Sequence, residues 1–162
     1  MKEELDAISQ ISELIISDKG FEDVLRLIVN ITAQVMKSNI CSLMLLDEKK
    51  KVLEIKATQS VSEAYNKKPP LKLGEGIAGK VALEKKPMII SDVRKDPHYR
   101  NKEIAEKEGL CSLVSLPLMV RGKIVGVLNL YTSEPREFSE DDIKTLTTIT
   151  NQAAVVIENY RL

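Results

Sequence analysis

The sequence predicts an α+β fold of three layers, in which helices cover both faces of a central antiparallel sheet of five or six strands. Apolar residues recur at helical spacing near both ends of the chain. Two pairs of apolar segments, each joined by a short polar turn, predict hairpins and therefore antiparallel strands. The second pair is apolar at successive positions, so its strands need cover on both faces.

Two helices are predicted over residues 1–37. Apolar side chains recur at helical spacing over residues 4–16, and the polar segment 17–20 interrupts the repeat. A second repeat starts at Phe21 and fails near residues 38–39. We therefore expect an N-terminal pair of helices that lies against the sheet.

The first hairpin is predicted over residues 40–58. Ile40 to Asp47 is a compact apolar run, residues 52–58 alternate loosely, and the charged residues 47–51 form the turn. A looser segment follows, which ends at the Pro69-Pro70 pair, where a helix cannot continue.

The middle of the chain predicts short elements. A glycine-rich turn at residues 74–79 opens a helix through Lys85, and residues 88–91 predict a short strand. Asp96 as N-cap and Pro97 at the first helical position predict a further helix. A left-handed glycine, Gly109, is expected to end that helix.

The second hairpin joins residues 112–120 to residues 123–132 through a tight turn at Arg121-Gly122. Pro117 cannot donate to a ladder, so we expect a local bulge or an unpaired face there. The last helix is predicted from Ser139, because Ser139 and Asp142 form a capping box.

We predict one domain over residues 1–162. Its parts are N-terminal helices over 1–37, the sheet with middle helices over 40–132, and a C-terminal helix over 139–162. The terminal helices cover one face of the sheet, and residues 60–110 cover the other.

The composition narrows the class of function. The chain carries 24 basic and 24 acidic side chains, which gives no electrostatic drive towards nucleic acid or a membrane surface. The short basic runs, such as Lys67-Lys68, are interpreted as solvated. No apolar stretch approaches the roughly 20 residues that cross a bilayer. Two distant cysteines form no disulfide framework, so we expect a cytoplasmic protein.

The order of the elements, together with four short motifs, resembles the GAF domain family. The motifs are residues 73–79, residues 91–93 followed by Asp96-Pro97, residues 111–118 with the glycines and valines of 122–128, and residues 138–142. The resemblance implies a pocket between the sheet, the middle helices and a lid. Members bind cyclic nucleotides, tetrapyrroles, small metabolites or metals, so the fold does not determine a ligand or cofactor, which stays unknown here.

From the resemblance and strand parity we predict a ligand pocket and no catalytic or metal residues. The predicted lining residues are Ile77, Ile90, Asp92, His98, Tyr99, Ser115 and Asn129. Ser115 either bonds to backbone or faces the pocket. The free amides of the helix that follows the glycine-rich turn are a secondary candidate for an anionic group.

Two alternative functions stay open. A cyclic-nucleotide-binding regulatory domain of the phosphodiesterase type carries an Asn-Lys pair and a later Asp-Glu, whereas this chain has Asn129-Leu130 and Asp142-Ile143. A free methionine sulfoxide reductase resembles this chain in size and needs several thiols. That family has a cysteine where Ala78 stands, and Cys111 comes too late for its second one, although we expect Cys111 to be partly exposed.

We therefore predict a non-catalytic sensory domain that binds a small molecule or a partner and signals through its terminal helices. A metal at Asp92, Asp96, His98 and Tyr99 is not favoured, because local roles explain these residues. A covalent bilin is not favoured, because neither cysteine is near His98 in sequence. We expect a homodimer through the terminal helices and an output domain that is a separate protein or was removed.

Overall fold

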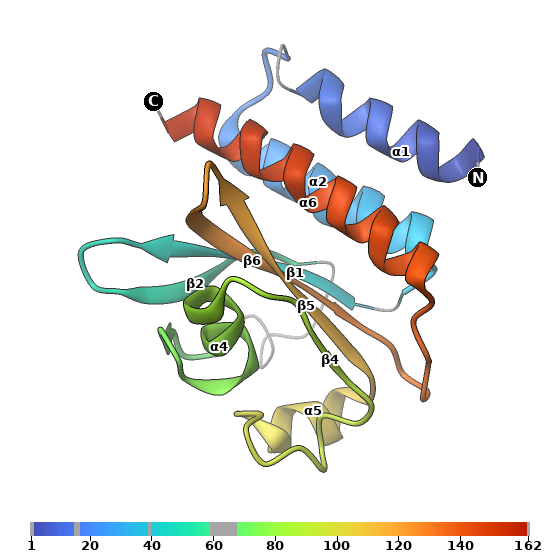
Figure 1. Ribbon diagram of the computed structural model, residues 1–162, viewed down its shortest axis with the longest axis vertical. Coiled ribbons are helices and arrows are strands. Elements are labelled where there is room, and N and C mark those ends of the chain that lie inside the picture. Colours follow the sequence, from blue (N-terminus) through green and yellow to red (C-terminus); the bar gives the residue numbers. More distant parts are fainter. Residues whose placement is uncertain (1, 15–16, 39, 59–67, 162) are drawn as a thin grey trace.

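A computed structural model describes residues 2–14, 17–38, 40–58 and 68–161. Figure 1 shows the helices and strands along the chain. Their bounds are α1 Lys2–Glu13, α2 Phe21–Met36, β1 Ile40–Asp47, β2 Val52–Thr58, β3 Leu71–Lys72, α4 Gly76–Glu84, β4 Met88–Ile90, α5 Lys102–Glu108, β5 Leu113–Val120, β6 Lys123–Tyr131 and α6 Glu140–Arg161.

The six strands form one antiparallel sheet in the order β3-β2-β1-β6-β5-β4. The two predicted hairpins are its β1–β2 and β5–β6 pairs, and β1 joins them by pairing with β6. This confirms the predicted α+β class with its antiparallel sheet. The two-residue strand β3 was not predicted, because so short a segment carries no periodic signal.

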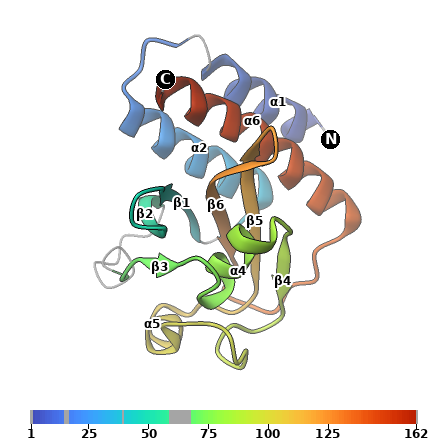
Figure 2. The ribbon, with the colours of Figure 1, turned by 60° about the vertical axis from the view of Figure 1, so that its left-hand side comes forward.

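Helices lie on both faces of the sheet. Helices α1, α2 and α6 pack together on one face, whereas α4 and α5 lie on the other (Figures 1 and 2). Side chains of β1 alternate between the two apolar clusters: Leu43 and Leu45 pack on the side of the terminal helices, and Met44 and Leu46 on the other side. The predicted three layers are confirmed.

Local predictions around the second hairpin hold. Arg121 and Gly122 both have positive φ, 53° and 77°, as a tight hairpin turn of the primed type requires. Strand β4 pairs with β5 only as far as Ser115, so no β4 partner lies beside Pro117. The register with β6 shifts between Leu118 and Met119, one residue beyond this proline.

The predicted capping box begins α6. The Ser139 backbone amide donates to the Asp142 carboxylate (3.1 Å), and the Asp142 amide donates to the Ser139 hydroxyl (3.0 Å). At the other end of the chain α1 ends at Glu13, and residues 15–16 of the predicted helix lie outside the described residues.

The helix predicted from Asp96 is wrong in its start, because α5 begins at Lys102. The Asp96 carboxylate accepts a hydrogen bond from the His98 amide (2.8 Å), which makes a local turn instead of a helix cap. Asn101 is left-handed (φ 62°), so a continuous helix cannot pass through it. Gly109 ends α5 in the left-handed conformation, as predicted.

One glycine of the 74–79 turn lets α4 approach the backbone of β3. A Cβ at Gly79 would lie 2.5 Å from the carbonyl oxygen of Lys72. Only a residue without a side chain fits at this contact, which places the first turn of α4 against the sheet edge.

Candidate functional site

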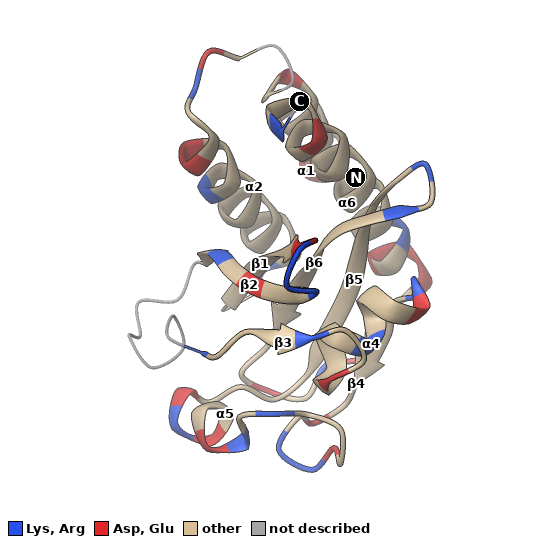
Figure 3. Cartoon of the chain, turned by 90° about the vertical axis from the view of Figure 1, so that its left-hand side faces the viewer, with Lys and Arg blue, Asp and Glu red and all other residues tan. Residues whose placement is uncertain are grey.

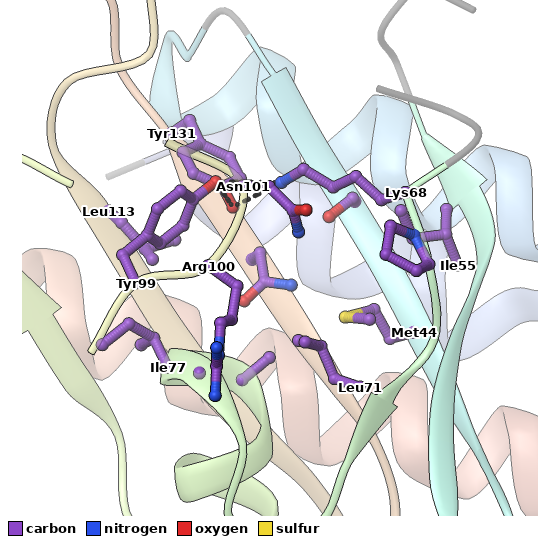
Figure 4. Close-up of a pocket in the computed structure, with 15 residues that line it drawn as sticks. Met44, Ile55, Lys68, Leu71, Ile77, Tyr99, Arg100, Asn101, Leu113 and Tyr131 are labelled. Carbon is purple, nitrogen blue, oxygen red and sulfur yellow. Dashed lines mark hydrogen bonds between the residues drawn. The ribbon is translucent and has the colours of Figure 1, made fainter. Parts of the chain in front are cut away.

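A small cavity lies between the sheet and the layer formed by α4 and the segment before α5 (Figure 4). Its sheet wall is formed by Ser42, Met44, Ile55, Leu113, Asn129 and Tyr131. The opposite wall is formed by residues 68–69, Leu71, the first turn of α4 (residues 76–78) and residues 99–101. The free volume of about 30 Å³ admits about two water molecules.

A lysine and two tyrosines meet at one end of the cavity. The Lys68 ammonium donates to the hydroxyl oxygens of Tyr99 (2.9 Å) and Tyr131 (3.4 Å), which themselves lie 2.9 Å apart (Figure 4). The Lys68 Nζ atom is also 5.3 Å from the centroid of each ring, within range of a cation–π interaction.

Burial changes the acidity of this cluster. Desolvation lowers the pKa of Lys68 to about 7. Desolvation also raises the pKa of Tyr99 to about 12, against the opposite effect of the hydrogen bond with Tyr131. Near neutral pH Tyr99 therefore stays protonated, whereas Lys68 can gain or lose its proton when its surroundings change.

A polar pair lies on the sheet wall. The Ser115 hydroxyl donates to the Asn129 Oδ1 atom (2.7 Å), and the two residues are directly opposite each other on β5 and β6. This bond occupies the amide oxygen of Asn129, so the side chain offers its Nδ2 hydrogens to the cavity that it lines.

The segment before α5 contributes three consecutive lining residues, Tyr99, Arg100 and Asn101. The Arg100 stem packs at Gly76, where an added Cβ would lie 3.2 Å from Arg100 Cγ. Arg100 itself is exposed, so its guanidinium lies at the mouth beside the first turn of α4 (Figure 4). We call residues 99–101 the lid segment.

Three predicted lining residues, Ile77, Tyr99 and Asn129, line this cavity. A fourth, Ser115, donates a hydrogen bond to Asn129 from the neighbouring strand. The other three lie elsewhere. Ile90 is buried in the apolar cluster on the same side of the sheet. His98 is exposed in the turn that Asp96 organises. His98 belongs to the segment that was expected to be helical, so its predicted orientation did not follow, whereas Ile90 ends β4.

Asp92 lies outside the cavity in a two-point ion pair with Arg94. The Arg94 Nε and Nη2 atoms donate to the two carboxylate oxygens at 2.9 Å and 3.0 Å. These bonds, together with the Arg94 backbone amide, lower the pKa of Asp92. The carboxylate is thus occupied by its own loop.

Sequence reasoning missed Lys68, Arg100, Asn101 and Tyr131. Tyr131 follows Asn129 by two residues on β6 and therefore shares its face, a signal that strand parity offers. Lys68 was interpreted as part of a solvated basic run. Only the tertiary structure carries its side chain to the two tyrosines.

The two cysteines lie away from the cavity. Cys41 packs in the cluster on the side of the terminal helices, and burial raises the pKa of its thiol well above the ordinary value. Cys111, expected to be partly exposed, is buried at 1% exposure. Its amide donates to the Thr132 carbonyl (2.8 Å) and its thiol contacts the Ser91 carbonyl (3.7 Å), which explains the difference.

Acidic and basic positions are interspersed over the molecule. Figure 3 shows both signs around α5, and the β1–β2 turn carries Asp47 and Glu48 next to three lysines. Within the described ranges, no helix has the length and apolar character of a membrane span. The same residues contain no cluster of three or more histidine, cysteine or acidic side chains arranged to hold a metal ion.

The family model described as "GAF domain" matches residues 18–158, most of the chain. The chain belongs to the GAF domain family. It is 29% identical over 158 residues to a methyl sulfide methyltransferase-associated sensor of Methanosarcina acetivorans. That match covers 94% of this GAF domain and 16% of the relative, so the chain spans a small part of the longer sensor.

Solved structures agree with the family. The GAF domain of an Acinetobacter phosphoenolpyruvate-protein phosphotransferase is 27% identical, with a TM-score of 0.82 over 98% of this chain and 94% of the other. A free methionine-R-sulfoxide reductase from Neisseria meningitidis, in complex with its substrate, has a TM-score of 0.81 at 18% identity over 98% of this chain and 90% of its own. At 18% identity this similarity shows a shared fold and nothing about activity. GAF domains of this kind occur as sensor domains of signalling and regulatory proteins.

Proposed function

We propose that this GAF domain is a non-catalytic sensor that binds a small ligand in the cavity beneath the lid segment. The observation that carries the proposal is a cavity with largely apolar walls and a few convergent polar groups: Lys68, Tyr99, Tyr131 and Asn129. This combination is typical of sites that bind a small molecule.

The sheet offers a route for the signal. Met44 lines the cavity, whereas its neighbours Leu43 and Leu45 pack with the terminal helices. A ligand that shifts β1 therefore acts on α2 across the sheet. The response passes to an output segment, which is either a separate protein or part of a longer chain, as in the Methanosarcina sensor that the domain matches over 16% of its length.

The test is native mass spectrometry of the purified protein after exposure to a metabolite extract. We expect a small-molecule adduct on the wild type. Ala78→Leu, which fills the cavity from α4, should lose the adduct, whereas Ala57→Leu on β2, outside the lining, should keep it. No adduct on the wild type, or an equal adduct on Ala78→Leu, would contradict the proposal.

Reductase chemistry is the alternative that the Neisseria structure raises. Ala78 lines the cavity, and both cysteines lie outside the lining that the structure describes. We expect no turnover of free methionine sulfoxide above a blank. Turnover that is lost in Cys111→Ser would make the domain an enzyme.

The proposed sensor is a homodimer that joins through its terminal helices and works in the cytoplasm. Leu5 on α1 (58% exposed) and Val155 on α6 (40%) present apolar surface, and both cysteines are free, as suits a reducing compartment. Sedimentation at micromolar concentration tests the assembly. A monomer there would contradict the dimer.

A further inference from the structure

The described residues that line the cavity include basic side chains and no acidic ones. Lys68 and Arg100 are the basic side chains, and no aspartate or glutamate lies among the described lining residues. The whole chain has equal numbers of acidic and basic side chains, so this local excess of cations does not follow from composition. A cavity with a cationic lining favours an anionic guest.

Hydrogen-bond donors also dominate the polar lining. The Ser115 hydroxyl occupies Oδ1 of Asn129, which leaves the Nδ2 hydrogens of Asn129 for the cavity. The hydroxyl oxygens of Tyr99 and Tyr131 both accept from Lys68, and a hydrogen bond between the two hydroxyls occupies the proton of one of them. A ligand with several acceptor oxygens can accept hydrogen bonds from these donors.

The first turn of α4 also favours a negatively charged group in the cavity. Gly76, Ile77 and Ala78 line the cavity, and the first amides of a helix have no partner within it. The first turn itself contains no acidic side chain; the N-cap before it is Glu75, whose carboxylate makes no hydrogen bond to the helix amides but offsets part of the positive end of the helix dipole. This end of α4 therefore supports an anion without determining its position alone.

Size limits the guest. A free volume of about 30 Å³ leaves room for about two water molecules, so the cavity accepts only a few heavy atoms unless the lid segment moves. The stem of Arg100 packs on Gly76 while its guanidinium remains exposed, which suits a side chain that draws an anion to the entrance.

We propose that the ligand of this cavity is a small organic carboxylate, whose anionic group lies at the Lys68–Tyr99–Tyr131 end and which Arg100 attracts at the mouth. The inference rests on the proposed sensory function and names the chemical class of its ligand. Because Lys68 has a pKa of about 7, binding of a carboxylate above that pH is accompanied by proton uptake.

The test is isothermal titration of the full 162-residue chain at pH 8 with acetate, lactate and succinate. Acetamide, lactamide and succinamide serve as neutral analogues of the same shape, and inorganic phosphate as a second anion. We expect at least one carboxylate to bind ten-fold or more tightly than its amide and than phosphate. Titration in Tris and in HEPES should show uptake of a proton on binding.

Variants locate the anion. Lys68→Met should weaken carboxylate binding at least ten-fold and abolish proton uptake. Arg100→Met should weaken carboxylate binding less than Lys68→Met does, and the affinity that it loses should be smaller at high salt, because salt screens the exposed guanidinium. The control Lys72→Met removes an exposed lysine of β3 outside the lining and should change affinity less than two-fold.

Several results would overturn the carboxylate assignment. They are equal binding of amides and acids, tighter binding of phosphate, unchanged affinity in Lys68→Met, and no binding of any carboxylate. In each case the metabolite-extract experiment decides separately whether the domain is a sensor for another small molecule. An adduct there that is lost in Ala78→Leu would keep the proposed function and discard the ligand class.

Discussion

The hydroxyl oxygens of Tyr99 and Tyr131 lie 2.9 Å apart, although Tyr99 belongs to the lid segment and Tyr131 ends β6. Their rings meet edge to face, with centroids 6.3 Å apart at an angle of 82°. Lys68 donates to both hydroxyls, so three segments distant in the chain converge on one polar contact. The hydrogen bond between the two tyrosine hydroxyls therefore connects the lid segment to the sheet.

Tyr99→Phe should therefore destabilise the fold. The change removes one acceptor of the Lys68 ammonium and one partner of the Tyr131 hydroxyl, and we expect the free energy of unfolding to fall by about 1–3 kcal/mol. Urea denaturation measures the change. The same substitution at Tyr160, whose hydroxyl bonds the Lys19 carbonyl at the surface, should cost less, and equal losses would contradict the structural role of the Tyr99 hydroxyl.

Lys68 should make stability depend on pH. Its folded pKa of about 7 lies below the value of about 10.4 in an unfolded chain, so the unfolded state binds more protons between these values. The free energy of unfolding of the wild type should rise relative to Lys68→Met from pH 7 to pH 10, by an amount on the order of 3 kcal/mol. Tyr99, with its pKa of about 12, stays neutral in this window. Urea denaturation of both proteins at several pH values measures the difference, and a difference that does not change with pH would contradict the lowered pKa.

Much of the fold could be predicted because its signals are local. The β1 and β2 bounds follow from an apolar run and a charged turn, and the start of α6 follows from the Ser139–Asp142 capping box. The lid could not be predicted in this way. Asp96 and Pro97 carry a helix-start signal, but the Asp96 carboxylate bonds the His98 amide and Asn101 turns left-handed before the helix forms.

The cavity was only partly predictable, since its lining depends on contacts between distant segments. Asn129 and Ile77 follow from strand parity and from the position of the glycine-rich turn. Lys68 has no such signal, because its role arises only where residues 99 and 131 meet it. A charged residue in a loop is usually solvated, and tertiary packing overrides that expectation here.

Ser139→Ala should lower stability through the loss of one hydrogen bond of the capping box. The Asp142 amide loses its acceptor, and such caps contribute about 1 kcal/mol. Thermal or urea unfolding measures the effect. Ser9→Ala, on the exposed side of α1, is the matched control and should change stability by less than about 0.5 kcal/mol. If both variants unfold alike, the capping box does not stabilise α6.

Gly79→Ala tests how closely α4 must approach the sheet edge. A Cβ at this position would lie 2.5 Å from the Lys72 carbonyl oxygen, a backbone atom that cannot rotate away. The helix must therefore shift from β3, and we expect a loss of about 1–3 kcal/mol in the free energy of unfolding. Because the first turn of α4 forms one wall of the cavity, the shift should also weaken binding of any ligand that the wild type retains.

Gly20→Ala, where an added Cβ meets no atom within 4 Å, is the control; it should change stability by about 1 kcal/mol or less and leave binding unchanged. Full stability in Gly79→Ala would show that α4 does not depend on this close approach.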